Sequence, residues 1–281
     1  MYAGFYGLTH SPFGMPRDSR QIFLAPTHRE ALSAIIYGAL ERKPFTVVLG
    51  EVGLGKTTVL NAALAGLAEQ GARILRYWNP LAGADGLVRL IGGEAGLADA
   101  PALGVADMER ACRALAGVIV PGGRAVLVVD DAQSLAREPL ELLRLMSDLP
   151  FGEASLQVVL VGQPEFGQAL QTHALRSLRQ RVALQHVIEA LPPREARDYL
   201  RYRIELAGGS LPGVMTRWAV AAIVRRARGI PRRLNTLADT ALIAGYAAGR
   251  RRVTARLVRQ AAAVPAGGLH PQPQAYSLRW L

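Results

Sequence analysis

Short apolar runs alternate with longer helical stretches through the middle of this chain. Five runs have the length and apolar content of buried strands, and they cover residues 45–49, 73–78, 125–129, 156–161 and 183–188. Segments with helical spacing or composition lie between them, at 57–69, 87–92, 106–119, 139–149 and 169–181. Strands separated by helices predict an α/β fold, in which a parallel five-stranded sheet is sandwiched by helices.

The pattern changes after Leu191-Pro192-Pro193, where the strand signal stops. Four segments beyond this point have helical spacing, namely 194–206, 216–228, 233–248 and 254–263. We therefore expect a lead-in rich in Pro and Gly, an α/β core, a small all-helical lid domain and a flexible tail. Their expected bounds are 1–28, 29–191, 192–263 and 264–281.

Composition narrows the class of protein. The chain has 281 residues, with 33 basic and 22 acidic residues, a formal net charge of +11 and one cysteine, Cys112. A single cysteine excludes an internal disulfide and a cysteine-rich zinc site. The sequence has no transmembrane segment and no secretory signal, so we expect a cytoplasmic protein. The positive charge fits nucleic acid, an anionic membrane face, or an arginine-rich composition without a functional meaning.

The most informative segment is Gly50-Glu51-Val52-Gly53-Leu54-Gly55-Lys56-Thr57, which fits the pattern G-x-x-x-x-G-K-[ST] between a predicted strand and a predicted helix. In that setting backbone N–H groups wrap a polyphosphate at the helix N-terminus. Lys56 reaches the β- and γ-phosphates, and the Thr57 hydroxyl binds Mg²⁺. Of the 33 basic residues, two are lysines, Lys43 and Lys56. The segment predicts a nucleoside triphosphate site, and a turn without a ligand is the alternative.

Two acidic residues, Asp130 and Asp131, follow the third predicted strand. In a P-loop fold the strand that carries the metal-associated Asp ends beside the phosphate loop. We expect Asp130 to hold Mg²⁺ through water and Asp131 to polarise the attacking water. Acidic residues commonly end strands, so the pair gains its meaning from the phosphate loop some 75 residues upstream.

Gln163 follows the fourth predicted strand, within Gly162-Gln163-Pro164. Its amide would lie beside the γ-phosphate, where it orients the water or senses the loss of phosphate. The alternative is an amide that caps the next turn of the chain.

Three arginines are candidates for contacts with the phosphates. Arg232 follows Gly229-Ile230-Pro231, a sharp helix entry, and would reach back from the lid. Arg181, or as second choice Arg179, would project across a subunit interface and stabilise charge in the transition state. The alternatives are a surface arginine at position 232 and pairing with a helix C-terminus at positions 179 and 181.

Together these motifs resemble the AAA+ ATPases of the ExeA/GspA type, a general secretion pathway family in the same broad group as the transposition ATPases TniB and TnsC. The resemblance covers nearly the whole chain. Its motifs occur in the family order: Tyr6-Gly7-Leu8, Ser11-Pro12-Phe13, Phe23-Leu24, Thr27-His28-Arg29-Glu30-Ala31-Leu32, residues 50–58, Asp130-Asp131-Ala132-Gln133, Gly162-Gln163-Pro164-Glu165 and Gly229-Ile230-Pro231-Arg232.

The resemblance implies a P-loop NTPase of the AAA+ class with a helical lid, which uses ATP and Mg²⁺ and self-associates into rings or filaments that complete each site between subunits. It adds Thr58 to the phosphate loop and packs Phe23, Leu24 and His28 around the adenine. Asp131 stands where most related ATPases have Glu. Because this side chain is shorter by about 1.5 Å, we expect secure ATP binding and modest or partner-stimulated hydrolysis.

Three functions fit this sequence. The first is an ATP-driven switch that acts with a protein partner in secretion, pilus or exopolysaccharide assembly. The second is a DNA-binding regulator of transposition, in which arginine clusters of the lid contact DNA phosphates, unless those clusters are only solvated helix faces. The clusters are Arg225, Arg226 and Arg228, then Arg232 and Arg233, then Arg250, Arg251 and Arg252. The third is an ATP-dependent scaffold with little hydrolysis, which Asp131 permits.

Overall fold

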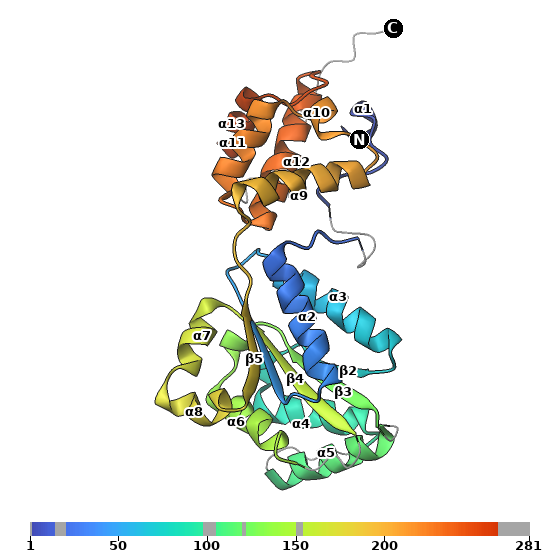
Figure 1. Cartoon of the computed structure of the whole chain (residues 1–281), viewed down its shortest axis with the longest axis vertical. Coiled ribbons are helices and arrows are strands. Elements are labelled where there is room, and N and C mark those ends of the chain that lie inside the picture. The colour runs from blue at the N-terminus through green and yellow to red at the C-terminus, as the bar shows by residue number, and fades with distance from the viewer. Residues whose placement is uncertain (1, 15–20, 98–104, 120–121, 150–153, 264–281) are drawn as a thin grey trace. The chain divides into compact units, whose positions relative to one another are not determined.

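The computed structural model of the chain describes residues 2–14, 21–97, 105–119, 122–149 and 154–263 (Figure 1). These residues form two compact units. The first consists of residues 21–190, and the second joins residues 2–14 to residues 191–263. The boundary at Leu191 adjoins residue 192, where the sequence places the start of the helical domain.

A parallel sheet of five strands, in the order β2-β3-β4-β1-β5, forms the centre of the first unit. The strands are β1 (Phe45–Leu49), β2 (Arg73–Tyr77), β3 (Arg124–Val129), β4 (Ser155–Gly162) and β5 (Val182–Val187). All five predicted strands are confirmed, with ends that shift by at most one residue. The register pairs Leu49 with Gly162 and Val129 with Leu160, so β1, β3 and β4 end at the same edge of the sheet.

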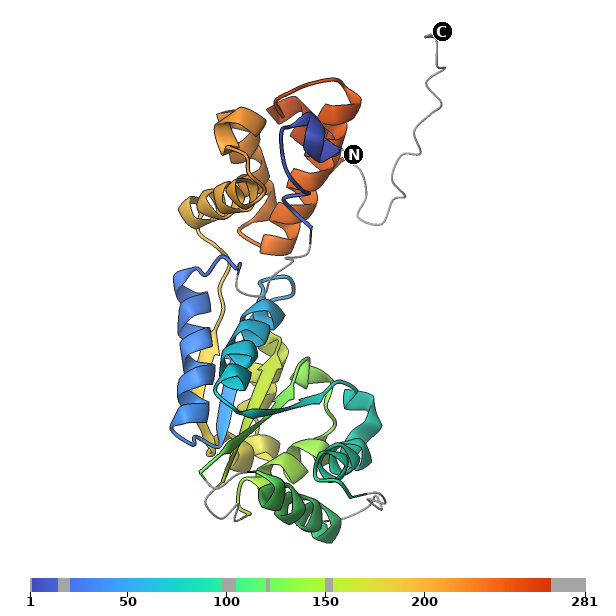
Figure 2. The ribbon, with the colours of Figure 1, turned by 90° about the vertical axis from the view of Figure 1, so that its right-hand side faces the viewer.

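Helices cover both faces of this sheet. On one face α2 (Pro26–Leu40) and α3 (Lys56–Glu69) lie side by side (Figure 2). Side chains on the other face form one apolar core with α4 (Gly83–Glu94), α5 (Val105–Val118), α6 (Arg137–Met146) and α7 (Pro164–Leu170). Because both faces are covered, all five residues of β1 are buried, as an apolar run without alternation predicts. Burial within this core also raises the pKa of the Cys112 thiol to about 12, so this cysteine is a packing residue.

A buried polar contact fastens α2 to the sheet. The Gln157 Nε2 atom donates to Thr46 Oγ1 at 2.9 Å and to the Ile35 carbonyl at 3.4 Å. Gly38 leaves room for this amide, since a Cβ at that position would lie 2.0 Å from Gln157 Nε2. The two hydrogen bonds offset part of the cost of removing the amide from water, and they fix the position of α2 along the strands.

The second unit is helical, and the helices predicted beyond residue 191 are confirmed. It contains α9 (Pro193–Leu206), α10 (Leu211–Val214), α11 (Arg217–Ala227), α12 (Pro231–Ala247) and α13 (Ala255–Ala262), together with α1 (Tyr2–Phe5). At its entrance the Leu191 N–H donates to the Gly229 carbonyl at 2.9 Å. Gly229 has a φ of +74°, and a Cβ there would lie 2.1 Å from the Leu191 carbonyl oxygen, so the position requires glycine.

Residues 2–14, which we call the N-terminal strap, pack on the helices of the second unit. Arg203 of α9 donates to the carbonyl of Pro12 at 2.7 Å and to the carbonyl of Gly14. The Tyr6 hydroxyl donates to the Leu242 carbonyl of α12 at 3.0 Å. The sequence predicts residues 1–28 as one lead-in segment, in which Phe23, Leu24 and His28 border the adenine. The structure instead places the strap in the helical unit, because its hydrogen bonds run to α9 and α12.

Two helical segments differ from the sequence pattern. The pattern predicts one helix over 169–181, whereas the structure has α7, a 3-10 turn at His173–Leu175, and α8 (Arg176–Arg179). The Thr172 hydroxyl donates to the Ala169 carbonyl at 2.6 Å, a local bond that competes with continuation of the helix. The pattern also missed α2, a helix of 15 residues. In the part of the chain that the structure describes, no helix has the length and apolar content needed to cross a membrane.

Replacing Arg203 with Met should destabilise the second unit by about 3–6 kcal/mol, because hydrogen bonds from a charged donor contribute about 1.5–3 kcal/mol each and the strap loses two of them. Urea unfolding followed by circular dichroism measures this loss. Arg201→Met is the matched control on the same helix, where an exposed ion pair with Asp198 is lost at a cost below about 1 kcal/mol. Equal losses in the two variants would contradict the role of Arg203.

Candidate nucleotide-binding site

The segment predicted to bind phosphate forms a tight loop between β1 and α3. Gly53 and Gly55 have φ values of +84° and +97°, in the left-handed region that glycine adopts without strain. A Cβ on Gly50 would lie 2.8 Å from the Ile188 carbonyl oxygen, so the start of the loop passes close to the end of β5. α3 begins at Lys56, directly after Gly55. The backbone N–H groups at its first turn therefore stand at the loop, as anion binding requires.

Lys56 lies within this loop. Its side chain is buried, and the Nζ atom donates to the carbonyl oxygens of Gly50 at 2.7 Å and Glu51 at 3.0 Å. Val52, Thr57 and Thr58 are exposed around it. The loop itself thus positions the ammonium group. The exposed residues Val52, Thr57 and Thr58 are among those that the sequence predicts to bind phosphate.

Thr57 and Asp130 meet at the carboxyl edge of the sheet. The Thr57 Oγ1 atom donates to Asp130 Oδ2 at 2.8 Å, which joins the first turn of α3 to the end of β3. A hydroxyl and a carboxylate oxygen at this separation suit a hard cation such as Mg²⁺, which takes few protein ligands and keeps several waters. Among the described residues no three His, Cys, Asp or Glu side chains gather into a metal cluster.

Asp131 and Gln163 are linked through a residue that the sequence analysis did not single out. The Gln133 Nε2 atom donates to Asp131 Oδ1 at 3.0 Å, and Gln133 Oε1 accepts the Gln163 backbone N–H at 3.0 Å. Asp131 has a φ of +56°, and its N–H donates to Asp130 Oδ1 at 3.0 Å. The ends of β3 and β4 are therefore tied together by one side-chain amide. Gln133 could have been found from the sequence, because it ends the motif Asp130-Asp131-Ala132-Gln133.

His28, Phe23 and Leu24 belong to the segment that leads into α2. His28 is buried, and its Nε2 atom lies 2.8 Å from the Leu54 carbonyl of the phosphate loop. The Leu24 carbonyl accepts a hydrogen bond from Arg29 Nη1 at 2.8 Å, and Phe23 is half-buried. The structure thus places His28 against the phosphate loop, with the two apolar residues of the expected adenine pocket a few positions before it.

Arg179 and Arg181 lie elsewhere on the first unit. Both precede β5, so they stand at the amino edge of the sheet, whereas the phosphate loop follows the carboxyl end of β1. Arg181 forms an ion pair with Asp148, and Arg179 Nη1 donates to Gln171 Oε1 at 2.9 Å. A single chain does not bring either arginine to the loop. Arg232 is exposed at the second residue of α12, in the other unit.

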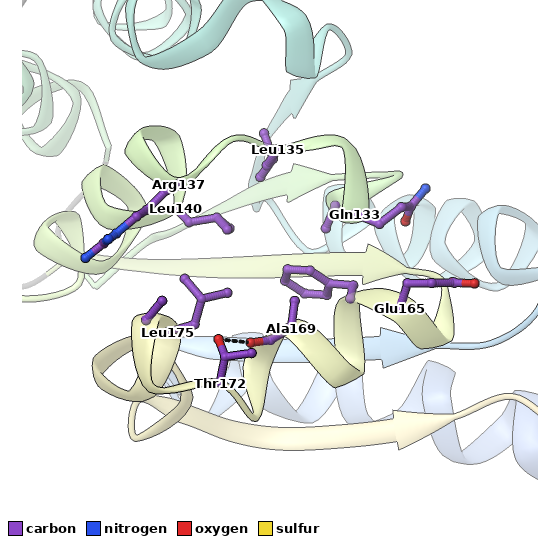
Figure 3. Close-up of a pocket in the computed structure, with 11 residues that line it drawn as sticks. Gln133, Leu135, Arg137, Leu140, Glu165, Ala169, Thr172 and Leu175 are labelled. Atoms are coloured by element: carbon purple, nitrogen blue, oxygen red, sulfur yellow. Dashed lines mark hydrogen bonds between the residues drawn. The ribbon is translucent and has the colours of Figure 1, made fainter.

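A pocket of about 270 Å³ lies beside Gln133, between the 3-10 turn Ala132–Ser134, α6 and α7 (Figure 3). Leu140 and Leu175 are among its apolar lining residues. Figure 3 shows Gln133 and Glu165 at the end of the pocket nearest the strand arrowheads, which mark the carboxyl edge of the sheet. Gln133 is partly exposed and is one of the residues that line this pocket.

The chain is similar in sequence to known proteins. A family model described as an AAA domain matches residues 39–170. General secretion pathway protein A of Aeromonas hydrophila is 35% identical over 257 residues, which cover 90% of this chain and 46% of that protein. The chain therefore spans about half the length of this relative.

Solved structures share the fold. The ORC2 protein of Aeropyrum pernix, solved as ADPNP–ADP complexes, matches with a TM-score of 0.64 at 20% identity, covering 90% of this chain and 70% of that one. The Thermotoga maritima RuvB Holliday junction branch migration motor matches with a TM-score of 0.58 at 18% identity. The match covers 89% of this chain and 73% of that one. Likeness at this identity concerns the fold alone, and it confirms the predicted α/β class of P-loop AAA+ proteins.

Replacing Lys56 with Ala should weaken nucleotide binding by at least about 100-fold, since the substitution removes the charge that the loop positions for phosphate. Titration with a fluorescent ADP or ATP analogue measures the dissociation constant directly. Lys43→Ala is the matched control because it removes the other lysine of the chain and should leave the constant unchanged. Similar binding by the two variants would remove residues 50–57 as the phosphate site.

Proposed function

We propose that this chain is an AAA+ ATPase of the ExeA/GspA type, which binds ATP with Mg²⁺ at residues 50–58 and hydrolyses it slowly. The observation that carries this proposal is the 2.8 Å hydrogen bond between Thr57 and Asp130, beside a buried lysine held by the loop. A structural turn without a ligand has no need for a lysine, a hydroxyl and a carboxylate at one edge of the sheet.

Thr57 and Asp130 would hold the Mg²⁺ ion, Asp130 through water. When bound, the ion supplies positive charge that stabilises the phosphate oxygens. In hydrolysis a water oxygen bonds to the γ-phosphorus, the bond to the β,γ-bridging oxygen breaks, and ADP and phosphate leave. Asp131 would accept the proton of that water and Gln163 would orient the water. The short Asp131 side chain is the reason that we propose slow or partner-stimulated turnover.

We further propose that each site is completed by a neighbouring copy in a ring or filament. Arg181 is our first choice for this contact and Arg179 the second. Both stand at the amino edge of their own sheet, opposite the phosphate loop, so either residue would contact the phosphates of another subunit. Arg181 would first exchange its ion pair with Asp148, a partly exposed pair that contributes little to stability. Within a chain, Arg232 would approach the phosphates from the lid, and Phe23, Leu24 and His28 would border the adenine.

The cellular role that we propose is an oligomeric switch for a secretion, pilus or exopolysaccharide assembly system, with a protein partner. The relative that supports this role is General secretion pathway protein A, of which the chain matches 46%. We place the activity in the cytoplasm, where ATP is supplied. A scaffold that binds ATP with little hydrolysis is the limiting case of the same proposal, and Asp131 is the residue that would decide between the two.

Replacing Asp130 with Asn should abolish Mg²⁺-dependent ATP hydrolysis while ADP binding without metal persists, because the substitution removes the metal-associated charge and leaves the phosphate loop intact. Phosphate release measured across a Mg²⁺ titration is the test. Asp85→Asn, in the first turn of α4, is the matched control and should hydrolyse ATP normally. Hydrolysis undiminished in Asp130→Asn would contradict the metal assignment.

A second candidate function, binding of DNA in transposition, is favoured by how charge divides between the two units. Residues 191–263 contain 15 arginines, no lysine and four acidic residues, a formal charge of +11. Residues 1–190 contain 17 basic and 18 acidic residues. The helical unit therefore carries the entire net charge of the chain, and on α13 both Arg256 and Arg259 are exposed. Such a field attracts the phosphate backbone of DNA without regard to sequence.

Replacing Arg250, Arg256 and Arg259 with Gln together should weaken duplex DNA binding and reduce the slope of log affinity against log salt by about 2–3, since each phosphate contact contributes about 0.9 to that slope. Fluorescence anisotropy at several salt concentrations measures both quantities. The control is the replacement of Arg89, Arg110 and Arg113 in the first unit, which removes the same charge and should leave the slope unchanged. Equal effects of the two triple variants, or binding to anionic vesicles without binding to DNA, would overturn this candidate.

A further inference from the structure

We infer that Gln133 is a positioning residue for ATP hydrolysis: its amide holds the Asp131 carboxylate and the end of β4 in one geometry. The inference rests on the proposed function, in which Asp131 and Gln163 flank the attacking water. It assigns a role to a side chain outside the phosphate loop.

Both ends of the Gln133 amide are in use. Nε2 donates to Asp131 Oδ1 at 3.0 Å, and Oε1 accepts the Gln163 N–H at 3.0 Å. The task needs a donor and an acceptor on one planar group at this reach. Glutamate would offer acceptors only, lysine would offer donors only, and asparagine is one methylene shorter.

The backbone of Asp131 is held independently of its side chain. Its N–H donates to Asp130 Oδ1 at 3.0 Å, and its carbonyl accepts the Ser134 N–H at 2.8 Å. These bonds stabilise a left-handed conformation, with φ of +56°, that non-glycine residues rarely adopt. With the backbone fixed, the direction of the carboxylate depends on what its own oxygens bind, and the described partner of Oδ1 is Gln133.

An aspartate at this position benefits from such a partner. It is shorter than glutamate, so a small rotation would carry its oxygen out of reach of the water. With Oδ1 held by the amide, Oδ2 is the oxygen that can accept the proton. The same amide fixes Gln163 through its backbone N–H, at the N-cap of α7. Gln133 therefore sets the direction of the Asp131 carboxylate and the position of the Gln163 backbone.

Gln133 lies at the surface of the first unit, where its side chain is not enclosed by the core. The side chain is partly exposed, and it lines the 270 Å³ pocket together with Glu165 (Figure 3). The two described hydrogen bonds of the amide join it to Asp131 and to Gln163. Loss of those bonds should change the geometry of the site without unfolding the unit.

The test compares Gln133→Met with Gln168→Met. Methionine keeps the size of the side chain and removes both hydrogen bonds. We expect kcat to fall by about 10- to 100-fold in Gln133→Met, the loss typical of a group displaced by about 1 Å, with KM and ADP affinity changed less than about threefold. Gln168, exposed on α7, is the matched glutamine, and its variant should match the wild type.

Two further measurements separate positioning from a merely structural role. Affinity for ADP with aluminium fluoride, which mimics the transferred phosphoryl group, should fall with kcat in Gln133→Met while ADP affinity holds. In an Asp131→Asn background the added Gln133→Met change should lower kcat less than it does in the wild type, because the part of its effect that acts through Asp131 is already lost. An unchanged kcat, or losses in kcat and ADP affinity of equal size, would overturn the inference. A wild-type protein that does not hydrolyse ATP would instead remove the proposed function itself.

Discussion

The hydrogen bond between Thr57 and Asp130 depends on the order of strands in the sheet. β1 and β3 are not neighbours, because β4 lies between them, and two strand spacings separate them by about 10 Å. Parallel direction brings the carboxyl ends of all three strands to one edge, and the first turn of α3 then spans the remaining gap. A sheet with another order or with one reversed strand would separate the hydroxyl from the carboxylate, and the metal site with it.

α2 links the stability of the core to the shape of the phosphate loop. Near its C-terminal end, Gly38 admits the Gln157 amide, which bonds to Thr46 of β1. Near its N-terminal end, His28 contacts the Leu54 carbonyl of the loop. Because a helix of 15 residues behaves as a rigid rod, its attachment to the sheet also fixes His28 at the loop. The loop is therefore supported from the helix that precedes β1 as well as from α3.

Local patterns predicted much of this molecule, and contacts distant in sequence account for the rest. The five strands, the phosphate loop and the acidic pair follow from apolar runs and short motifs, each of which is specified by its own residues. The sequence did not reveal that the strap packs on α9, because Arg203 and Pro12 are 191 residues apart and no local pattern near Pro12 indicates its partner. Gln133 was overlooked for a similar reason, since its importance comes from its contact with Gln163, which is 30 residues away and follows another strand.

The two proposals for this chain constrain one another through charge. A helical unit with a formal charge of +11 repels its own copies, whereas the nearly neutral ATPase unit does not. Rings or filaments that align several helical units would therefore assemble poorly at low salt unless a polyanion neutralises them. DNA, if it is that polyanion, would favour assembly, and assembly would bring a neighbour's arginine to each site. Polyanion binding and ATP hydrolysis would then be coupled through oligomer formation, with no need for a conformational path between the two units.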